Sequence, residues 1–203
     1  MKTQTWSIVT AALGLAVCTG CQDPSPDSSQ AGSDRPAAVA QSEQGGGQAE
    51  VTVDVASWSE VQDLVASHKG KVVVVDLWST WCVPCMREFP NLVKLQKQFP
   101  EQVACISVNL NYDGSDDAPP QSHRDEVLKF LTRQTASFQN IICSDPDEMM
   151  YDKLDLGSIP AIYVYDKQGN VHRRFDNDSG EYGEEGFTYE QHVIPLVKEL
   201  IGT

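Results

Sequence analysis

Apolar and polar positions follow two different periods along residues 51–203 of this 203-residue chain. Period-two alternation or a continuous apolar run predicts strands at residues 51–55, 71–78, 102–110, 138–143, 161–165 and 171–175. Apolar residues three and four positions apart predict helices at residues 57–68, 122–135, 146–154 and 189–201, and another that follows residues 81–85 and ends near Phe99. Strands therefore alternate with helices over this region.

This order of elements predicts an α/β fold built on one central sheet. The strand at residues 71–78 is apolar almost throughout, which is typical of a strand buried on both faces of a parallel sheet. The last two strands flank residues 166–170 and should form a hairpin, so we expect antiparallel pairing at that end of a largely parallel sheet. Ser57 or Ser59 should cap the first helix, and Ser122 a later one.

Residues 22–50 lack this pattern. They consist mainly of Gln, Ser, Pro, Asp, Ala and Gly and contain no aromatic residue. Such a segment cannot bury enough apolar surface to offset its ordering entropy. We therefore predict a disordered tether over residues 21–50, with a root-mean-square span of roughly 30 Å, ahead of one domain at residues 51–203.

A short apolar stretch at residues 8–17 stands near the beginning of the chain. It is too short to span a bilayer, so residues 1–20 are predicted to be a signal peptide for export to a compartment where disulfides persist. A cysteine after small residues at this point resembles the lipobox of bacterial lipoproteins. Cys21, preceded by Gly20, is the predicted lipidation site; Cys18 is the alternative register, and an ordinary signal peptide that releases a soluble protein is the other alternative.

The formal net charge of −14 limits the partners. It argues against binding to nucleic acid and against electrostatic binding to anionic lipid. The lipobox resemblance instead implies attachment through a lipid on the extracytoplasmic side of a bacterial membrane. The four histidines have no ligand spacing, and no metal site or cofactor is predicted. The acidic residues 176–181 lack the pattern of an EF-hand and are predicted to form an exposed loop.

Two cysteines three positions apart carry the candidate chemistry. Cys82 and Cys85, in the sequence WCVPC, come where a buried strand gives way to a helix. A helix N-terminus stabilises a thiolate, so Cys82 should be the nucleophile and Cys85 the resolving thiol of a redox-active Cys82–Cys85 disulfide. A structural disulfide or half of a zinc site are the alternatives. No second pair of cysteines follows at zinc-finger spacing, and Met86 stands where haem attachment would need histidine.

Several segments resemble the thioredoxin family, in the family's own order. Residues 75–85 (VDLWSTWCVPC) resemble its active-site segment, Pro90 falls at its helix-kinking proline, and residues 158–161 (SIPA) resemble its cis-proline loop. The resemblance covers residues 51–203. It implies a thioredoxin-like fold with a central mixed, largely parallel sheet flanked by helices on both faces.

Two features resemble the membrane-associated TlpA/ResA-like branch of that family. Cys82 and Pro160 are 78 positions apart (160 − 82), more than in a minimal thioredoxin, which implies an αβ insertion at residues 111–143 before the cis-proline loop. Residues 85–90 (CMREFP) resemble the branch's Cys-x-x-Glu-Phe-Pro run. Residues 51–68 depart from the branch, because they look like the strand–helix entry of thioredoxin itself.

The resemblance assigns roles to two acids. Asp76 ends an apolar strand, where a carboxylate is costly to bury without a task or partner. It matches the buried acid of thioredoxins, which implies proton transfer with the resolving thiol and a pKa raised toward neutrality by burial; an aspartate turned to solvent is the alternative. Glu88 lies one turn after Cys85 and matches a glutamate thought to tune the thiols, with an exposed glutamate beside Arg87 as the alternative.

The resemblance also implies a surface for client proteins. A cis bond between Ile159 and Pro160 would leave backbone polar groups of Ile159 free to pair with a partner strand, and an ordinary trans proline is the alternative. Trp78 and Trp81 are expected to pack around the dithiol and contribute to this surface, unless both are core residues.

Two further cysteines lie in predicted strands. Cys105 and Cys143 are expected to be buried, inert thiols, with a bridge between them or a relay with Cys85 as alternatives. The resemblance places Cys105 where thioredoxins often have the lysine that pairs with the buried acid. We therefore expect burial alone to set the pKa of Asp76.

The predicted function is thiol–disulfide exchange by an exported, membrane-tethered monomer. It would reduce disulfides of selected extracytoplasmic proteins with electrons from an upstream membrane thiol donor, because Ile159 and the Val-Pro pair between the cysteines resemble reducing members of the family. The alternative is a tethered binding module or copper(I) chaperone that uses Cys82 and Cys85 as ligands.

Overall fold

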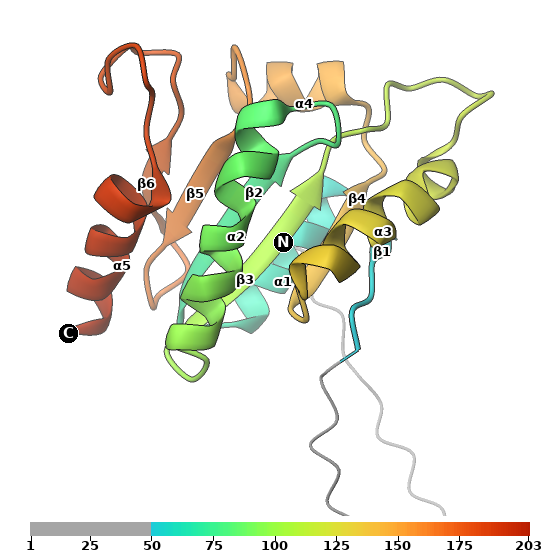
Figure 1. Ribbon diagram of the computed structural model, residues 1–203. Coiled ribbons are helices and arrows are strands. Elements are labelled where there is room, and N and C mark those ends of the chain that lie inside the picture. The colour runs from blue at the N-terminus through green and yellow to red at the C-terminus, as the bar shows by residue number, and fades with distance from the viewer. Residues whose placement is uncertain (1–49) are drawn as a thin grey trace, which may run out of the picture. The chain divides into compact units, whose positions relative to one another are not determined.

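A six-stranded sheet with the order β1-β4-β3-β2-β5-β6 forms the centre of the fold (Figure 1). The computed structural model describes residues 50–203. The strands are β1 (Asp54–Ala56), β2 (Val72–Trp78), β3 (Val103–Asn109), β4 (Gln139–Cys143), β5 (Ala161–Tyr165) and β6 (Val171–Phe175). β1 to β4 are mutually parallel, and β5 and β6 are antiparallel, as the sequence predicted. The predicted signal peptide, Cys21 and nearly all of the tether lie outside the described residues.

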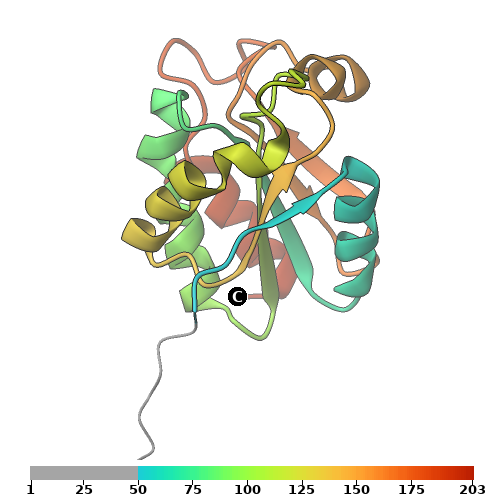
Figure 2. The ribbon, with the colours of Figure 1, turned by 90° about the vertical axis from the view of Figure 1, so that its right-hand side faces the viewer.

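Helices cover both faces of the sheet (Figure 2). They are α1 (Trp58–Ser67), α2 (Val83–Gln98), α3 (Arg124–Gln134) after the 3-10 turn η1 (Pro120–His123), α4 (Asp147–Leu154), and α5 (Ile194–Ile201) after the π-helical turn η2 (Tyr189–Val193). α2, α3 and α5 lie on one face, and α1 and α4 on the other. In the described part of the chain, no helix combines the length and apolarity needed to cross a bilayer.

The core forms where the apolar runs meet. All seven residues of β2 are buried, and β2 lies between β3 and β5. On the α2 face, the Trp78 ring packs against Phe89 of α2 and Phe130 of α3, with ring centroids 5.0 and 4.8 Å apart. Burial of a large aromatic side chain contributes about 1.5–3 kcal/mol to folding. This cluster fixes α2, and therefore the cysteines at its start, against the end of β2.

Helix starts differ in how well the sequence predicted them. Ser57 caps α1 and forms a capping box with Glu60, as expected. The prediction that Ser122 caps a helix was wrong, because Ser122 lies inside η1 and its hydroxyl donates to the carbonyl of Pro119 at 2.7 Å. Pro120 has its φ preset for a helical turn, so the turn begins before the serine.

The first strand is shorter than its apolar alternation predicted. β1 begins at Asp54, and before it the carbonyl of Thr52 accepts a hydrogen bond at 3.0 Å from the side chain of Asn140 in β4. β1 runs parallel to β4, and through β3 to β2. The start of β1, where the chain enters the described fold, therefore lies at the opposite end of the strands from the C-terminal end of β2 (Figures 1 and 2).

Candidate active site

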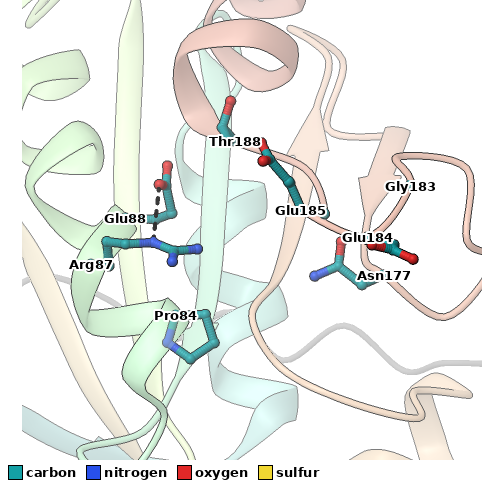
Figure 3. A pocket seen from close by; sticks show the side chains of 9 residues that line it. Pro84, Arg87, Glu88, Asn177, Gly183, Glu184, Glu185 and Thr188 are labelled. Carbon is teal, nitrogen blue, oxygen red and sulfur yellow. Dashed lines mark ion pairs between the residues drawn. The ribbon is translucent and has the colours of Figure 1, made fainter.

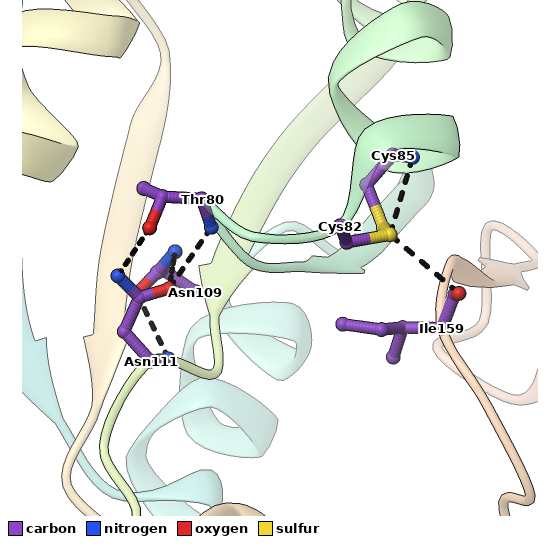
Figure 4. Close-up of a disulfide and its surroundings, with 6 residues drawn as sticks. All are labelled: Thr80, Cys82, Cys85, Asn109, Asn111 and Ile159. Atoms are coloured by element: carbon purple, nitrogen blue, oxygen red, sulfur yellow. Dashed lines mark hydrogen bonds between the residues drawn. A yellow bond between two sulfur atoms is a disulfide. The ribbon is translucent and has the colours of Figure 1, made fainter.

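The two cysteines of the WCVPC segment form a disulfide at the N-terminus of α2 (Figure 4). Their Cα atoms are 5.3 Å apart. Cys82 is the N-cap residue of α2, and its sulfur accepts a hydrogen bond from the backbone N–H of Cys85 at 3.2 Å. This N–H is one of the unpaired donors of the first turn, so the same contact would stabilise a thiolate on Cys82 after reduction.

Both sulfur-bearing residues are buried in the oxidised state. Cys82 is 5% exposed and Cys85 is 2% exposed, so exposure differs little between the two cysteines. The residues that precede and follow Cys82 in the chain are exposed by contrast: Trp81 is 58% exposed and Val83 is 69% exposed. Trp78 is buried in the aromatic core, so of the two tryptophans only Trp81 can meet a partner protein.

The loop before β5 faces the disulfide. The peptide bond between Ile159 and Pro160 is cis, and the carbonyl oxygen of Ile159 lies 3.6 Å from the Cys82 sulfur (Figure 4). The Ile159 backbone thus lies directly beside Cys82, the cysteine that the sequence predicts to be the nucleophile. A reduced Cys82 thiol could donate to this carbonyl, because a thiol is a weak hydrogen-bond donor.

Asp178, in the loop after β6, binds the loop that carries the proline. Its carboxylate accepts from the backbone N–H of Gly157 at 2.7 Å and from the Ser158 hydroxyl at 3.0 Å. A Cβ atom on residue 157 would lie 2.9 Å from Asp178 Oδ1, so glycine allows this close approach. The contact joins residues that are 21 positions apart.

The acidic segment after β6 is therefore more than the exposed loop that the sequence predicted. Asp176 is buried and forms an ion pair with Arg174, which also donates to the carbonyl oxygens of Leu154 and Asp155. Asp176 in turn accepts from the backbone N–H of Asp178 at 3.0 Å. The contacts of Arg174, Asp176 and Asp178 therefore join the loop after β6 to the first part of the proline loop, from its start at Leu154 to Ser158.

Asp76 of β2 is buried, at 3% exposure. Burial raises its pKa to about 7, a hydrogen bond from Tyr189 opposes that rise, and the negative charge of Glu88 adds to it. The hydroxyl of Tyr189 donates to Asp76 Oδ2 at 2.7 Å, whereas Oδ1 has no partner among the described residues. The prediction that burial raises this pKa toward neutrality is confirmed, and the hydrogen bond from Tyr189 is an influence that the sequence did not predict.

Glu88 is half-buried between α2 and η2. Its carboxylate accepts from the backbone N–H of Tyr189 at 3.1 Å and from the Asn91 side chain at 3.3 Å, and lies 3.9 Å from Arg87 Nε. Its side chain is 13% exposed, so the alternative of a solvent-exposed glutamate does not describe it. Its hydrogen bonds go to η2 and to its own helix.

A groove of about 750 Å³ opens beside Glu88 (Figure 3). Pro84, Arg87 and Glu88 of α2 form one wall, and residues 177, 183–186 and 188 form the other. Arg87 and Glu88 lie together on the α2 side, and Glu184 and Glu185 lie across from them (Figure 3). The groove adjoins the first turn of α2, where the disulfide lies.

A set of amide contacts holds the segment between β2 and the cysteines. The side chain of Asn111 accepts from the backbone N–H of Thr80 at 3.0 Å and donates to its hydroxyl at 2.7 Å (Figure 4). The Asn109 side chain donates to the same Asn111 oxygen at 3.0 Å. The end of β3 therefore supports the loop that presents Cys82.

Comparison with known proteins places this geometry in a family. The family model described as Redoxin matches residues 30–187, more than half of the chain. The chain belongs to the Redoxin family. The thioredoxin-like protein YneN of Bacillus subtilis (strain 168) is 28% identical over 103 residues, which cover 51% of this chain and 55% of YneN. The thiol-disulfide oxidoreductase ResA of the same organism is 28% identical over 113 residues, 55% of this chain and 54% of ResA.

This Redoxin-family chain spans about half the length of the curated relatives that it matches. Among solved structures, the thioredoxin-like superfamily protein SPOA0173 matches with a TM-score of 0.51 and 20% identity, over 68% of this chain and 85% of that chain. The predicted thioredoxin-like fold and the predicted resemblance to ResA are thus confirmed.

The other two cysteines within residues 50–203 of this Redoxin-family member, Cys105 and Cys143, are buried free thiols and do not bridge. Burial and the charge of Asp76 raise the pKa of Cys105, and burial raises the pKa of Cys143 to about 11. Both groups therefore stay protonated near neutral pH, where thiols attack disulfides poorly. Within residues 50–203, no group of three or more His, Cys, Asp or Glu side chains could hold a metal ion.

Sequence reasoning missed Tyr189, Asp178 and Asn111. Tyr189 begins an apolar helical pattern and is read from the sequence as a core residue, and its hydroxyl gives no local signal of a partner 113 positions away. Asp178 had a signal, because an acidic residue close to glycines and serines often caps backbone N–H groups. The sequence could not say which loop it would bind.

Proposed function

We propose that this protein is a thiol–disulfide oxidoreductase that reduces disulfides of selected proteins through Cys82 and Cys85. The observation that carries the proposal is the Cys82–Cys85 disulfide at the start of α2, with the Ile159 carbonyl 3.6 Å from Cys82 and the buried Asp76 on the same face of the sheet as α2. A structural disulfide would need neither neighbour. The names of YneN and ResA support the same chemistry.

The exchange proceeds in two displacements. The Cys82 thiolate attacks one sulfur of a client disulfide, forming a mixed disulfide and releasing the other client sulfur as a thiolate. The Cys85 thiolate then attacks the Cys82 sulfur, which forms the Cys82–Cys85 disulfide and releases the second client thiolate. Two electrons pass to the client, and a thiol donor returns two electrons to the oxidised protein. We propose that this donor is an upstream membrane protein with a reactive thiol.

Asp76 is proposed to accept the proton of the Cys85 thiol during the second displacement. A carboxyl with a pKa of about 7 is half ionised near neutral pH, so it can take this proton and later pass it on. Cys85, at 2% exposure, has little access to water as an alternative base. Glu88 is proposed to bias this step through its charge.

The client is proposed to lie across the loop that carries Pro160 and against Trp81. The Ile159 backbone lines Cys82, and the exposed indole of Trp81 offers an apolar contact beside it. An extended client segment could pair with the loop backbone and place its disulfide against Cys82.

We further propose export and membrane tethering through a lipid on Cys21, with residues 21–50 as the tether and a monomer as the working form. The apolar segment at residues 8–17 and the small residues before Cys21 support this proposal. Mass spectrometry of the mature N-terminus tests it: a lipid on Cys21 is expected. A lipid on Cys18 would move the anchor, and cleavage without a lipid would remove it.

Insulin reduction in the presence of dithiothreitol tests the proposed activity. The oxidised protein should accelerate insulin precipitation, and a Cys85→Ser variant should trap clients as mixed disulfides because attack survives while resolution is lost. Equilibration with glutathione then gives the reduction potential, and a value near that of thioredoxin is expected for a reductant. Retention of copper(I) on desalting without insulin reduction would instead favour a binding module.

A further inference from the structure

Among the described residues, Tyr189 alone hydrogen-bonds to both Asp76 and Glu88, the two acids of the site. Its hydroxyl donates to Asp76 Oδ2 at 2.7 Å, and its backbone N–H donates to Glu88 Oε2 at 3.1 Å. Tyr189 is fully buried at the first position of η2, 101 positions from Glu88 and 113 from Asp76. A single residue of the C-terminal segment thus fixes the distance between the two carboxylates.

The local structure holds Tyr189 in this position. Thr188 caps η2 by accepting the backbone N–H of Gln191 at 3.2 Å, and its own N–H donates to His192 Nδ1 at 3.0 Å. The preceding Phe187 N–H donates to Asn177 at 3.0 Å. The N–H of Tyr189 belongs to the first turn and has no partner within the helix, so it is free to bind Glu88.

The two oxygens of Asp76 are not equivalent. The phenol of Tyr189 occupies Oδ2, and Oδ1 has no partner among residues 50–203. Two titratable groups act on the pKa of Asp76: Tyr189 from η2, through its hydrogen bond, and Glu88 from α2, through its charge. The Cys105 thiol of β3 also lies near Asp76, whose charge raises the pKa of that thiol. Burial and the charge of Asp76 raise the pKa of Tyr189 well above its usual value, so the phenol remains a donor across the physiological range.

We propose that Tyr189 is a positioning residue for proton transfer: its phenol holds Oδ2 of Asp76, which leaves Oδ1 as the oxygen that takes and returns the proton. This inference rests on the proposed proton-transfer role of Asp76. The phenol also stabilises the carboxylate form, because a hydrogen bond to a charged acceptor favours that form. Tyr189 therefore offsets part of the effect that burial and Glu88 have on Asp76.

The experiment compares Tyr189→Phe with wild type in single-turnover resolution of a mixed disulfide, measured from pH 5 to 9. Loss of the phenol should move the midpoint of the pH profile upward by about one pH unit, because a hydrogen bond to a charged group and a pKa unit have similar energies. The ¹³Cγ resonance of Asp76 should titrate with the same displacement. Phenylalanine keeps the ring, so packing is nearly preserved.

Tyr165→Phe is the matched control. Tyr165 is also buried, and its hydroxyl accepts a hydrogen bond from the Gln62 side chain at 3.1 Å. It lies in β5 opposite Val73, near the start of β2 and away from the cysteines that follow the end of that strand. Its removal should leave the pH profile unchanged.

The double variant Asp76→Asn/Tyr189→Phe separates positioning from packing. If Tyr189 acts through Asp76, the double variant should resolve mixed disulfides at the rate of Asp76→Asn alone. Additive losses, or an equal loss at every pH in Tyr189→Phe, would overturn the inference. If Asp76→Asn itself leaves the rate and its pH profile unchanged, the proton-transfer role fails first.

A measurement on the wild-type protein covers the case in which Tyr189→Phe does not fold. The Tyr189 hydroxyl proton should be protected from exchange with solvent, and its NMR shift should change with the same midpoint as the Asp76 carboxyl. A hydroxyl proton that exchanges freely, or that does not respond to Asp76, would contradict the inference.

Discussion

The disulfide lies between two regions that are built from different kinds of contact. On the side of β2 and α2, Asp76 is buried and Glu88 is half-buried, and the charge of Glu88 raises the pKa of Asp76. On the opposite side, Ile159 offers Cys82 a backbone carbonyl, and its loop is held by Asp178. The first region can exchange a proton near neutral pH, whereas the second can only position a partner. Substitutions in the first should therefore change rates with pH, and substitutions in the second should change client binding.

The largest effect is expected from removal of the Cys82 sulfur, which lies between the two regions. Cys82→Ser should reduce the catalysed rate of insulin reduction to the uncatalysed background, because a serine hydroxyl cannot form the mixed disulfide. The rate of insulin precipitation measures this. Cys143→Ala, which removes a buried free thiol elsewhere in the sheet, should retain the wild-type rate. Retained turnover in Cys82→Ser would show that another thiol attacks the client.

Asp76→Asn tests the proton-exchanging region. It should slow resolution of the mixed disulfide roughly 100-fold near pH 7, the range expected for loss of a general base. The deficit should shrink at high pH, where the Cys85 thiolate forms without a base. Stopped-flow measurement from pH 6 to 9 follows this change. Glu88→Gln should show a smaller effect, and an unchanged profile in Asp76→Asn would assign the acid no part in the reaction.

The same acid predicts how stability depends on pH. The pKa of Asp76 is about 7 in the fold, against 3.8 for the ordinary group, so the folded protein keeps a proton that the unfolded chain has lost between these values. The unfolded state then binds fewer protons, and the free energy of unfolding should fall as pH rises from about 4 to about 7. In urea unfolding, Asp76→Asn should gain stability over wild type across this window, on the order of a few kcal/mol. Parallel curves for the two proteins would contradict the assignment.

Asp178→Ala tests the positioning region. Loss of the contacts to Gly157 and Ser158, each worth about 1 kcal/mol, should raise the KM for a protein client about 5- to 10-fold. Iodoacetamide labelling of reduced Cys82 should keep its pH dependence, because no acid has been removed from the other side. Asp166→Ala is the control, since Asp166 makes similar contacts in the β5–β6 turn. A displaced labelling profile in Asp178→Ala would mean that the two regions are not separable.

The smallest effect is expected at Trp81. Its indole is exposed, so Trp81→Ala should change the free energy of unfolding by less than about 0.5 kcal/mol. It should raise the KM for a protein client roughly threefold and leave exchange with small thiols unchanged, because only a large partner reaches the indole. Val171→Ala, which truncates another exposed apolar side chain, should leave KM unchanged. An equal loss with small thiols would assign Trp81 to the chemistry.

The two regions also differ in how much of them the sequence predicted. The dithiol, the burial of Asp76 and the position of Glu88 follow from local patterns, because an apolar strand and the first turn of a helix determine where their residues lie. The bonds of Tyr189 to Asp76 and of Asp178 to Gly157 depend on how distant segments pack. Periodicity reports which face of an element is buried, and it carries no information on which polar atoms meet there. The sequence therefore predicted the sheet and the reacting sulfurs better than the contacts that tune and position them.

The direction of β1 has a consequence for a protein held at its N-terminus. The chain enters the fold at the end of the strands opposite to the one at which β2 ends. β2 spans seven residues, about 23 Å at 3.3 Å per residue. The reacting sulfurs and the point at which residue 50 enters the domain therefore lie at opposite ends of the sheet. If the proposed lipid anchor is present, a tether with a span of roughly 30 Å would let the domain turn until the sulfurs reach a disulfide close to the bilayer, whereas a short linker would hold them away from it.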